Sequence, residues 1–393
     1  MLIHSARRMK AFQENIFTEL ANIKKAKVAQ GIELIDLSIG SPDLAPPPSV
    51  LQTLAQEATN PNKYGYALKG TEDFHRAITN YYMRNYQVDL DSDNEVLTLM
   101  GSQDGLVHLP MALCEPGDYV LVPDPGYTAY AAGVSMAGAT MYPMPLKKES
   151  GYLPSLEDIP LEVCEKAKLM ILNYPGNPIP VVASADFFKA AISFAKRHNI
   201  VILHDFAYSE LYYDRKPVSF LSVDGAKDVG IEMNSLSKSF NMAGCRIAYA
   251  AGNHELLQLL KMLKSNLDYG VFLPIQAAAT VALEQPSEFL EKNRAIYRKR
   301  RDTLIGGLRQ LGWKVISPEA SMFIWAEIPQ GFTAKEFTFS LIEKANVVVT
   351  PGNAFGKWGE GYVRIALVQS EEMLKKGLKQ IEKSGLFHAV REG

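Results

Sequence analysis

The sequence predicts an α/β protein in which a large domain, built on a mostly parallel sheet of about seven strands, is joined to a smaller α/β domain. Two observations support this fold class. Between residues 94 and 250, short apolar runs alternate with segments of helical length. Such continuous apolar strands, separated by helices, are typical of a parallel sheet covered on both faces. Short strand-like and helix-like segments also recur near both ends of the chain, so the two termini are expected to build the smaller domain together.

The strands of the large sheet are expected at seven short apolar runs: 96–99, 119–122, 140–142, 168–172, 200–203, 229–233 and 247–250. Segments between them, such as 184–198, have the length and the period of helices. Ligands of open parallel sheets bind beyond the carboxyl ends of the strands. The candidate site residues are therefore those that follow the expected strands: Gly101, Asp124, Asn173, Asp205 and Ser235.

The outer parts of the chain predict the second domain. A helix is expected over 9–30 and another near 50–59, because apolar residues recur there at helical spacing or follow a proline-rich break. Later come a helix-rich stretch, 289–311, and a final helix, 371–384; four short strands are expected at 313–316, 322–327, 347–350 and 362–366. The 393 residues thus divide into an N-terminal segment of the small domain, 1–44, a large domain, 45–285, and a small C-terminal domain, 286–393.

Composition narrows the class of ligand. The formal net charge is −2, which gives no electrostatic footprint for nucleic acid or an anionic membrane, so the expected ligand is a small molecule. No uncharged apolar run approaches the ~18 residues of a membrane span, and the N-terminus lacks a secretory pattern. The three cysteines are widely separated, which favours neither a metal site nor a disulfide framework and fits a reducing cytoplasm.

The strongest chemical signal runs from Ser235 to Arg246. It places Lys238 in a serine-rich turn, with Ser237 before it and an arginine eight residues later. A lysine amine forms a Schiff base with an aldehyde. Hydroxyls and a guanidinium hold a phosphate through charge-assisted hydrogen bonds. A solvated lysine in a surface loop would explain an isolated Ser-x-Ser-Lys, but not the whole string.

The complete string resembles the pyridoxal-phosphate attachment signature of the class I/II aminotransferases, which have the fold type I architecture of aspartate aminotransferase. Further motifs of that family follow in order over roughly 32–386. The resemblance implies that Lys238 holds pyridoxal 5′-phosphate as an internal aldimine. It also implies that Ser235, Ser237 and Arg246 bind the cofactor.

Asp205 and Tyr208 support this interpretation independently. A carboxylate beside a pyridine nitrogen keeps that nitrogen protonated, and the cationic ring then withdraws electrons from a carbanion. The phenol three residues later can donate to the cofactor's ring oxygen. Taken alone, an aspartate after a strand is as readily the cap of the next helix. The resemblance implies the two cofactor roles.

Three further residues form a turn that opens a helix, Gly101, Ser102 and Gln103. Free N–H groups at a helix start favour a phosphate, although such a turn is more often a simple cap. The resemblance makes these residues part of the phosphate site. It also matches Tyr127 to the aromatic residue that stacks on the pyridine ring; the alternative is an ordinary core tyrosine.

The substrate is expected to meet Arg364, a lone arginine in an apolar strand, because a buried guanidinium requires an anion such as an α-carboxylate. A structural salt bridge is the alternative. By resemblance, Asn177 contacts both cofactor and substrate, and Ile39 and Gly40 belong to a mobile segment whose backbone touches the carboxylate. Ile179-Pro180 replaces the family's usual Thr-Gly after the Asn-Pro motif, which puts the geometry of that turn in question.

Tyr64 and Tyr66 resemble the tyrosine that reaches the phosphate of a neighbouring subunit, and the spacing leaves both as candidates. The resemblance therefore implies a homodimer with shared active sites. The function expected is ping-pong transfer of an amino group between an L-amino acid and a 2-oxo acid. A pyridoxal-phosphate-dependent C–S β-lyase is the first alternative, and a cofactor-binding regulator is a remote one. No motif selects the donor among LL-diaminopimelate, alanine, aspartate and aromatic amino acids.

Overall fold

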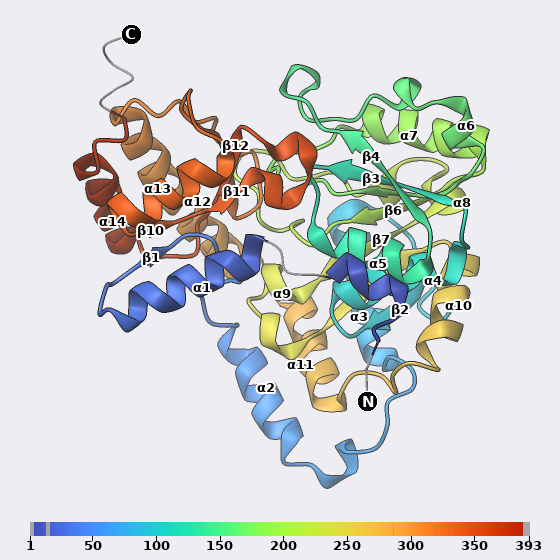
Figure 1. The fold of residues 1–393 in the computed structure, drawn as a ribbon. Coiled ribbons are helices and arrows are strands. Elements are labelled where there is room, and N and C mark those ends of the chain that lie inside the picture. Colours follow the sequence, from blue (N-terminus) through green and yellow to red (C-terminus); the bar gives the residue numbers. More distant parts are fainter. Residues whose placement is uncertain (1–3, 13–15, 286, 388–393) are drawn as a thin grey trace.

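The structure, a computed structural model, describes residues 4–12, 16–285 and 287–387. Its centre is a seven-stranded sheet with the order β2-β8-β7-β6-β5-β3-β4. Only β8 runs antiparallel to its two neighbours, and the other pairings are parallel (Figure 1). The bounds of the strands are β2 (Val96–Leu99), β3 (Tyr119–Asp124), β4 (Thr140–Pro145), β5 (Ala167–Leu172), β6 (Val201–Asp205), β7 (Gly230–Ser235) and β8 (Ala248–Gly252). The predicted mostly parallel sheet is confirmed.

Both faces of this sheet are buried, which explains why its strands are continuous apolar runs. In β5, for example, Met170 packs into the hydrophobic cluster on one face, whereas Leu169 and Ile171 pack into the cluster on the other. One face is covered by α3 (Glu72–Tyr86), α7 (Ala185–His198) and α11 (Leu273–Glu284). The other is covered by α4 (Ser102–Leu113), α5 (Thr128–Ala137) and α10 (His254–Lys264). Because successive side chains of a strand point to opposite faces of the sheet, each strand contributes residues to two separate hydrophobic cores.

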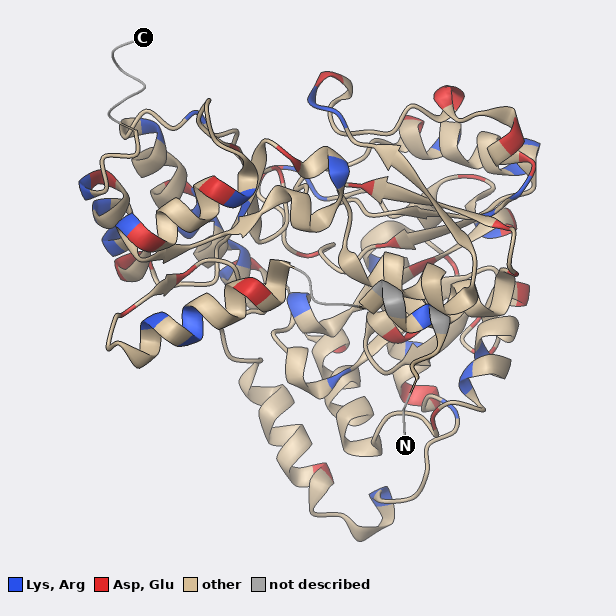
Figure 2. Ribbon diagram, viewed as in Figure 1, with Lys and Arg blue, Asp and Glu red and all other residues tan. Residues whose placement is uncertain are grey.

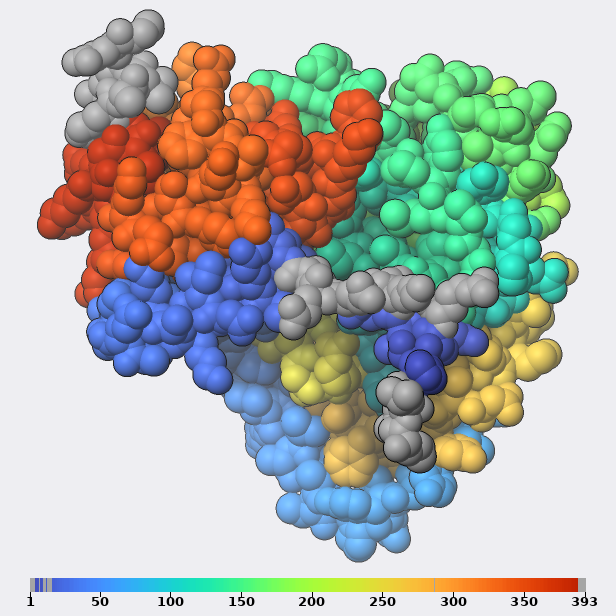
Figure 3. Space-filling view, viewed as in Figure 1, coloured from blue at the N-terminus to red at the C-terminus, as the bar shows by residue number. Residues whose placement is uncertain are grey.

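A second, smaller unit joins the two ends of the chain. The strand β1 (Ile35–Asp36) pairs in parallel with β10 (Val347–Val348), and β11 (Thr350–Pro351), β12 (Tyr362–Ala366) and β9 (Phe323–Glu327) form an antiparallel sheet. Around them pack α12 (Glu288–Gln310), α13 (Ala334–Ala345) and α14 (Glu371–Lys383). The N-terminal α1 (Ile16–Ala29) lies against this C-terminal part (Figures 1 and 3). The smaller α/β unit built from both termini is confirmed, while the domain boundaries stay a prediction.

Three predicted elements differ from the structure. The strand expected at 347–350 is two short strands, β10 and β11, which belong to different sheets. The helix expected over 9–30 is a 3₁₀ helix, Arg7–Phe12, and a separate α1; residues 13–15 of that prediction lie outside the described part of the chain. The strand expected at 313–316 is wrong, because only an isolated bridge joins Val315 to Ala326. Trp313 is buried there instead, with its indole N–H donating to the Glu327 carbonyl at 2.6 Å. The apolar residues of 313–316 therefore belong to a loop that packs into the core, and not to a strand that pairs with a neighbour.

Helix ends follow local capping chemistry. The side chains of Ser184 and Thr333 accept hydrogen bonds from the third residue of α7 and α13, and Thr333 belongs to a full capping box with Glu336. Asn199 and Asn346 end these two helices in the left-handed conformation that asparagine tolerates. The remaining helices are α2 (Pro48–Ala58), α6 (Leu161–Cys164), α8 (Ala226–Val229) and α9 (Leu236–Ser239).

Charged residues of both signs are scattered over the outer helices and loops, while the central strands carry few of them (Figure 2). No helix in the described part of the chain combines the length and the apolar character that crossing a membrane requires. Within the same residues, no group of three or more His, Cys, Asp or Glu side chains is arranged to hold a metal ion.

Candidate active site

A cavity of about 430 Å³ lies beyond the carboxyl ends of the central strands and is lined by residues from both units. Its lining contains every predicted site residue except Gly101, Asp124, Tyr64 and Tyr66. The Asp124 carboxylate instead accepts from the N–H groups of Lys357 and Trp358. The N-terminal segment and the smaller unit supply Ile39, Gly40 and Arg364. The large unit supplies Ser102, Gln103, Tyr127, Asn177, Asp205 and Tyr208, and the lysine motif supplies Ser235, Ser237, Lys238 and Arg246.

Lys238 enters the cavity from α9, a single helical turn placed directly after β7. The turn is held by its own serines: the Ser235 hydroxyl accepts from the Ser237 N–H at 3.2 Å, and the Ser239 hydroxyl donates to the Ser235 carbonyl at 3.1 Å. The Lys238 Nζ donates to the Gly40 carbonyl at 2.5 Å. Burial, followed by the nearby Arg364 and Arg246 cations, lowers the Lys238 pKa to about 8.

The N-terminal segment that presents Gly40 is fixed by an ion pair. Arg300 of α12 donates through Nη1 and Nη2 to the two carboxylate oxygens of Asp43, both at 2.7 Å, and through Nη1 to the Leu367 carbonyl at 3.0 Å. The Arg300 residue is 5% exposed. Bidentate geometry of this kind gives a carboxylate a defined position as well as a partner.

An anion cradle is formed by Gly101, the start of α4 and Arg246. Gly101 has a φ of +77°, and a Cβ at this position would lie 2.2 Å from Nη2 of Arg246. Only glycine therefore permits the guanidinium to lie this close to the turn. The first N–H groups of α4 have no carbonyl partner within the helix, and together with Arg246 they suit a phosphate.

Asp205 ends β6 and is 4% exposed. Its Oδ2 accepts from the Tyr130 hydroxyl at 2.8 Å, and its Oδ1 accepts from the Ala207 N–H at 3.3 Å. Burial raises the Asp205 pKa, and these hydrogen bonds oppose the rise. No arginine or lysine of the described residues forms a salt bridge with it, so the carboxylate is suited to a cationic group in the cavity.

Arg364 is a buried guanidinium held by neutral acceptors. Its Nη1 donates to the Asn177 side-chain oxygen at 2.8 Å, and its Nη2 donates to the Ser38 carbonyl at 2.6 Å and to the Thr350 hydroxyl at 3.3 Å. Its Nε has no hydrogen-bond partner among the described residues. Burial lowers the Arg364 pKa to about 10, while Tyr208 and Tyr127 oppose the change. Such a group favours a carboxylate that enters the cavity.

The turn after Asn177 is well formed despite its unusual sequence. The Gly176 N–H donates to the Ile179 carbonyl at 3.1 Å, and the Pro180 carbonyl accepts from the Glu319 N–H at 3.1 Å. Asn173 holds the start of the loop, because its side-chain oxygen accepts from the Asn177 N–H at 2.9 Å. Ile179-Pro180 therefore leaves Asn177 on the cavity wall.

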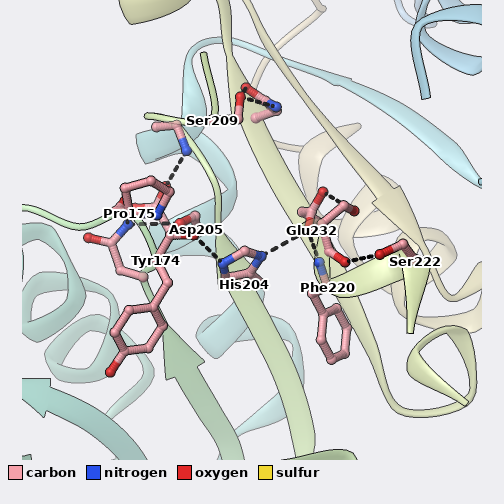
Figure 4. A network of polar contacts seen from close by, with 12 residues as sticks. Tyr174, Pro175, His204, Asp205, Ser209, Phe220, Ser222 and Glu232 are labelled. Carbon is pink, nitrogen blue, oxygen red and sulfur yellow. Dashed lines mark hydrogen bonds and ion pairs between the residues drawn. The ribbon is translucent and has the colours of Figure 1, made fainter. Parts of the chain in front are cut away.

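Behind Asp205 lies a buried polar network centred on His204 and Glu232, which are both fully buried (Figure 4). The His204 Nδ1 lies 2.8 Å from a Glu232 carboxylate oxygen, and its Nε2 lies 3.1 Å from the Tyr174 carbonyl. Glu232 also accepts from the Tyr82 and Ser219 hydroxyls, both at 2.8 Å, and from the Phe220 N–H at 2.7 Å. The network ties β6 and β7 to the loop that carries Asn177.

Tyr64 and Tyr66 do not line this chain's own cavity. They follow α2, at the end of the molecule where that helix projects, and they are 64% and 84% exposed (Figure 1). The Tyr64 hydroxyl donates to the Ala58 carbonyl at 2.7 Å. Their rings contact Phe272 and Tyr269, at centroid distances of 5.1 and 4.9 Å.

Sequence reasoning missed several residues that line the cavity, notably Phe17, Ser38 and Phe355. Ser38 contacts Arg364 through its backbone carbonyl, and a contact of this kind cannot be predicted from the residue type. Phe17 could have been noticed as an apolar residue of the N-terminal helix. An apolar residue in a helix is, however, normally predicted to be buried in the core rather than to line a cavity. Phe355 ends a 3₁₀ helix, Gly352–Phe355, between β11 and β12, where no element was predicted.

Comparison with known proteins identifies the family. The family model of aminotransferase class I and II matches residues 32–381. The chain belongs to this family. It is 41% identical to the LL-diaminopimelate aminotransferase of Moorella thermoacetica, over 97% of this chain and 98% of the relative.

Solved structures agree with the assignment. The substrate-bound structure of BacF from Bacillus subtilis superposes with a TM-score of 0.94 at 40% identity, covering 98% of both chains. A single mutant of the Thermus thermophilus aspartate aminotransferase has a TM-score of 0.90 at 26% identity, covering 98% of this chain and 100% of the other. The protein is a pyridoxal-phosphate-dependent aminotransferase of fold type I, with an amino acid and a 2-oxo acid as substrates.

The residues present fit this cofactor. The glycine-dependent cradle beside Arg246 suits the phosphate, and the buried Asp205 without a salt-bridge partner suits a protonated ring nitrogen. Lys238 presents an amine with a lowered pKa in the same cavity. These are the three chemical groups that a phosphorylated pyridine aldehyde requires.

The lowered Lys238 pKa predicts the pH dependence of cofactor attachment. Only the neutral amine attacks an aldehyde, so attachment to the cofactor-free protein should quicken as pH rises and level off above about 8. At pH 7 this places the neutral fraction roughly 300-fold above that of an ordinary lysine. Stopped-flow absorbance after mixing with pyridoxal phosphate measures the midpoint.

Two variants serve as controls for this prediction. Arg364→Gln should move the midpoint to higher pH because a nearby cation is lost, whereas Arg76→Gln, a charge change on an exposed side chain, should leave the midpoint unchanged. A midpoint near 10 in the wild type would contradict the assignment.

The His204–Glu232 pair predicts a large loss of stability on truncation. His204→Ala leaves the buried Glu232 carboxylate without its imidazole and the Tyr174 carbonyl without a donor, so unfolding in urea should become easier by about 3–5 kcal/mol. His254→Ala, at an exposed position in α10, should change the free energy of unfolding by less than about 0.5 kcal/mol. Equal effects of the two substitutions would show that the buried pair does not stabilise the fold.

Proposed function

We propose that the cavity between the two units is the active site, and that Lys238 is its catalytic base. One observation carries the proposal: an amine whose pKa is lowered to about 8 shares a 430 Å³ cavity with the buried Arg364 and Asp205. The reaction is transfer of the α-amino group of an L-amino acid to a 2-oxo acid in two half-reactions. The names of the sequence relatives make LL-diaminopimelate one donor to assay.

The large unit binds the cofactor. When bound, pyridoxal phosphate supplies an aldehyde carbon and a cationic ring that stabilises negative charge on the substrate Cα. Asp205 holds the proton on the ring nitrogen, Tyr208 and Asn177 donate to the ring oxygen, and Tyr127 stacks on the ring. The phosphate is bound by Gly101, Ser102, Gln103, Ser235, Ser237 and Arg246.

The smaller unit and the N-terminal segment orient the substrate. Arg364 binds the α-carboxylate through two parallel hydrogen bonds, supported by Asn177 and by the backbone of Ile39 and Gly40. With the cofactor bound, Lys238 would take the proton from the substrate Cα and deliver it to the cofactor, and would carry out the reverse transfer in the second half-reaction. Its lowered pKa keeps a useful fraction of the amine neutral near pH 7, so the base is ready to accept that proton.

The active form in this proposal is a homodimer in which Tyr64 or Tyr66 reaches the phosphate of the second subunit. Three observations support this arrangement: both tyrosines are highly exposed, neither lines the cavity of its own chain, and both follow the projecting α2. We also propose a cytoplasmic location, supported by three free cysteines, of which Cys114 and Cys164 are buried.

Removal of the base tests the function directly. Lys238→Ala should still bind cofactor, because the phosphate and ring contacts remain, but should form 2-oxo acid from an amino acid at least about 10²-fold more slowly. Single-turnover absorbance with L-alanine or LL-diaminopimelate as donor measures this. Undiminished turnover would exclude Lys238 as the base. Release of pyruvate, ammonia and a thiol from an amino acid with a Cβ–S bond, by the wild type and without an oxo-acid acceptor, would favour the C–S β-lyase alternative.

Asp205→Ala should weaken cofactor binding and slow removal of the α-proton, because the ring nitrogen loses its counter-charge. Fluorescence titration of the cofactor and the deuterium isotope effect with Cα-deuterated donor report the two effects separately. Asp205→Glu keeps the charge and should recover part of the rate. Wild-type binding and rates in the alanine variant would refute the role.

A further inference from the structure

A cluster of three charged side chains, Lys264, Asp104 and Asp268, lies outside the cavity and is largely shielded from water. Lys264 is the last residue of α10, and its Nζ donates to Oδ2 of Asp104 at 2.6 Å and to Oδ2 of Asp268 at 2.7 Å. The three side chains are 9%, 5% and 19% exposed, and the proposed function gives them no role. Removing charges from water is costly, and their mutual contacts offset that cost only while the geometry is kept. The three segments that carry them are therefore held at a fixed separation.

One end of this charged cluster reaches the anion cradle. Asp104 lies in the first turn of α4, and its Oδ2 also accepts from the Met100 N–H at 2.8 Å, directly before the cradle glycine Gly101. Its Oδ1 lies 2.7 Å from Nδ1 of His108. Burial acts to raise the Asp104 pKa, but hydrogen bonds with His108 and Lys264 outweigh it and hold the pKa below its usual value. Asp104 is thus a charged group that fixes the backbone from which the cradle starts.

Lys264 has an electrostatic role at the same end. The start of α4 suits a phosphate, because its free N–H groups and the helix dipole favour negative charge. The Asp104 carboxylate lies in that same turn, and like charges repel. The Lys264 ammonium neutralises the carboxylate, so the cradle can accept a phosphate while Asp104 still holds the Met100 N–H.

The other end of the cluster reaches the segment that carries the exposed tyrosines. Asp268 Oδ1 accepts from the Gly270 N–H at 2.7 Å, and the Tyr269 carbonyl accepts from the Ala67 N–H at 3.1 Å. Gly270 has a φ of +88°, and a Cβ there would overlap the Ala67 carbonyl oxygen. Tyr66, the neighbour of Ala67, contacts the Tyr269 ring at a centroid distance of 4.9 Å. The turn after α10 therefore sets the position of the tyrosine segment.

We propose that Asp104, Lys264 and Asp268 are positioning residues that connect the phosphate cradle of one subunit to the tyrosine segment that the same subunit gives to its partner. The inference rests on the proposed function, and in particular on its homodimer. In that dimer the two ends of the cluster serve different active sites. Asp104 supports the cradle of its own subunit, while Asp268 supports Tyr64 or Tyr66 at the phosphate of the other. Because both elements are held in place beforehand, less of the binding energy of the phosphate is spent on ordering them.

A comparison of two cofactor forms tests the role of Lys264. The dissociation constants of pyridoxal phosphate and of pyridoxal, which lacks the phosphate, are measured by absorbance titration of the cofactor-free protein. Lys264→Met should weaken pyridoxal phosphate by at least about tenfold, because contacts to charged groups are lost, and should leave pyridoxal within about twofold. Lys264→Arg keeps the charge and should recover most of the affinity. Equal weakening of the two forms, or no weakening, would overturn the inference.

A matched control separates this role from a general loss of stability. Arg294 of α12 forms another shielded ion pair, with its Nη1 2.9 Å from the Glu210 carboxylate and side chains that are 13% and 3% exposed. Arg294→Met should make unfolding in urea easier, as Lys264→Met does, but should keep the wild-type ratio of the two dissociation constants. The same change of ratio in both variants would show that loss of any buried ion pair produces it, and would contradict the role of Lys264.

Hybrid dimers test the connection between subunits. One subunit carries Asp268→Ala together with Lys238→Ala, the other is unaltered, and two affinity tags isolate the hybrid. Borohydride then fixes the cofactor only to Lys238 of the unaltered subunit, and the mass of that subunit reports its occupancy. This subunit should need at least about fivefold more pyridoxal phosphate for half-occupancy than in a control hybrid that carries Lys238→Ala alone.

The outcomes of the hybrid experiment separate the inference from the proposed function. An unchanged half-occupancy would overturn the inference and leave the proposed function intact. A chain that stays monomeric in solution would refute the homodimer and the inference together. A wild-type protein without any borohydride-fixed cofactor on Lys238 would overturn the proposed function itself.

Discussion

The arrangement of the two units depends on hydrogen-bond acceptors for one buried guanidinium, that of Arg364. Arg364 lies in β12 of the smaller unit, yet its donors reach Asn177 in the large unit and the Ser38 carbonyl in the N-terminal segment. A buried arginine without acceptors is strongly unfavourable, so three segments distant in sequence are drawn to one point. The active-site cavity lies where they meet. In the proposed function, the side chain that joins the two units would therefore also recognise the α-carboxylate of the substrate.

The lysine is subject to a related constraint. Burial makes its amine partly neutral, and the proposed role as base requires that the amine can also move toward the cofactor and the substrate. In the structure the Gly40 carbonyl accepts its hydrogen bond, as the Ser38 carbonyl does for Arg364. Backbone carbonyls thus satisfy both cations without a permanent counter-ion. A carboxylate that enters the cavity can replace one of these neutral contacts with a charge-assisted one.

The sequence predicted those parts of the enzyme in which a chemical role, or the regular spacing of apolar residues in a strand or helix, restricts which residue types are possible. The strands of the large sheet alternate between two buried faces, and Lys238, Asp205 and Arg364 are residues whose burial requires a function or a partner. The rest depends on contacts that sequence does not encode locally. Trp313 looked like part of a strand because a buried loop is also apolar. Ser38 acts through its carbonyl, and Phe17 and Phe355 meet only after α1 folds against the smaller unit. In the proposed homodimer, the exposed Tyr64 and Tyr66 would contact a second copy of the chain, and local sequence patterns do not describe such a contact.

The Arg300–Asp43 pair has a consequence for the thermodynamics of ligand capture. It fixes the N-terminal strip just beyond Gly40, while the pairing of β1 with β10 fixes it just before Ser38. A strip tethered at both ends has little conformational entropy left to lose when an amino acid arrives, so less of the interaction energy is spent on ordering it. Lengthening the strip between its tethers would raise its conformational entropy in the free enzyme and would therefore weaken the binding of amino acids.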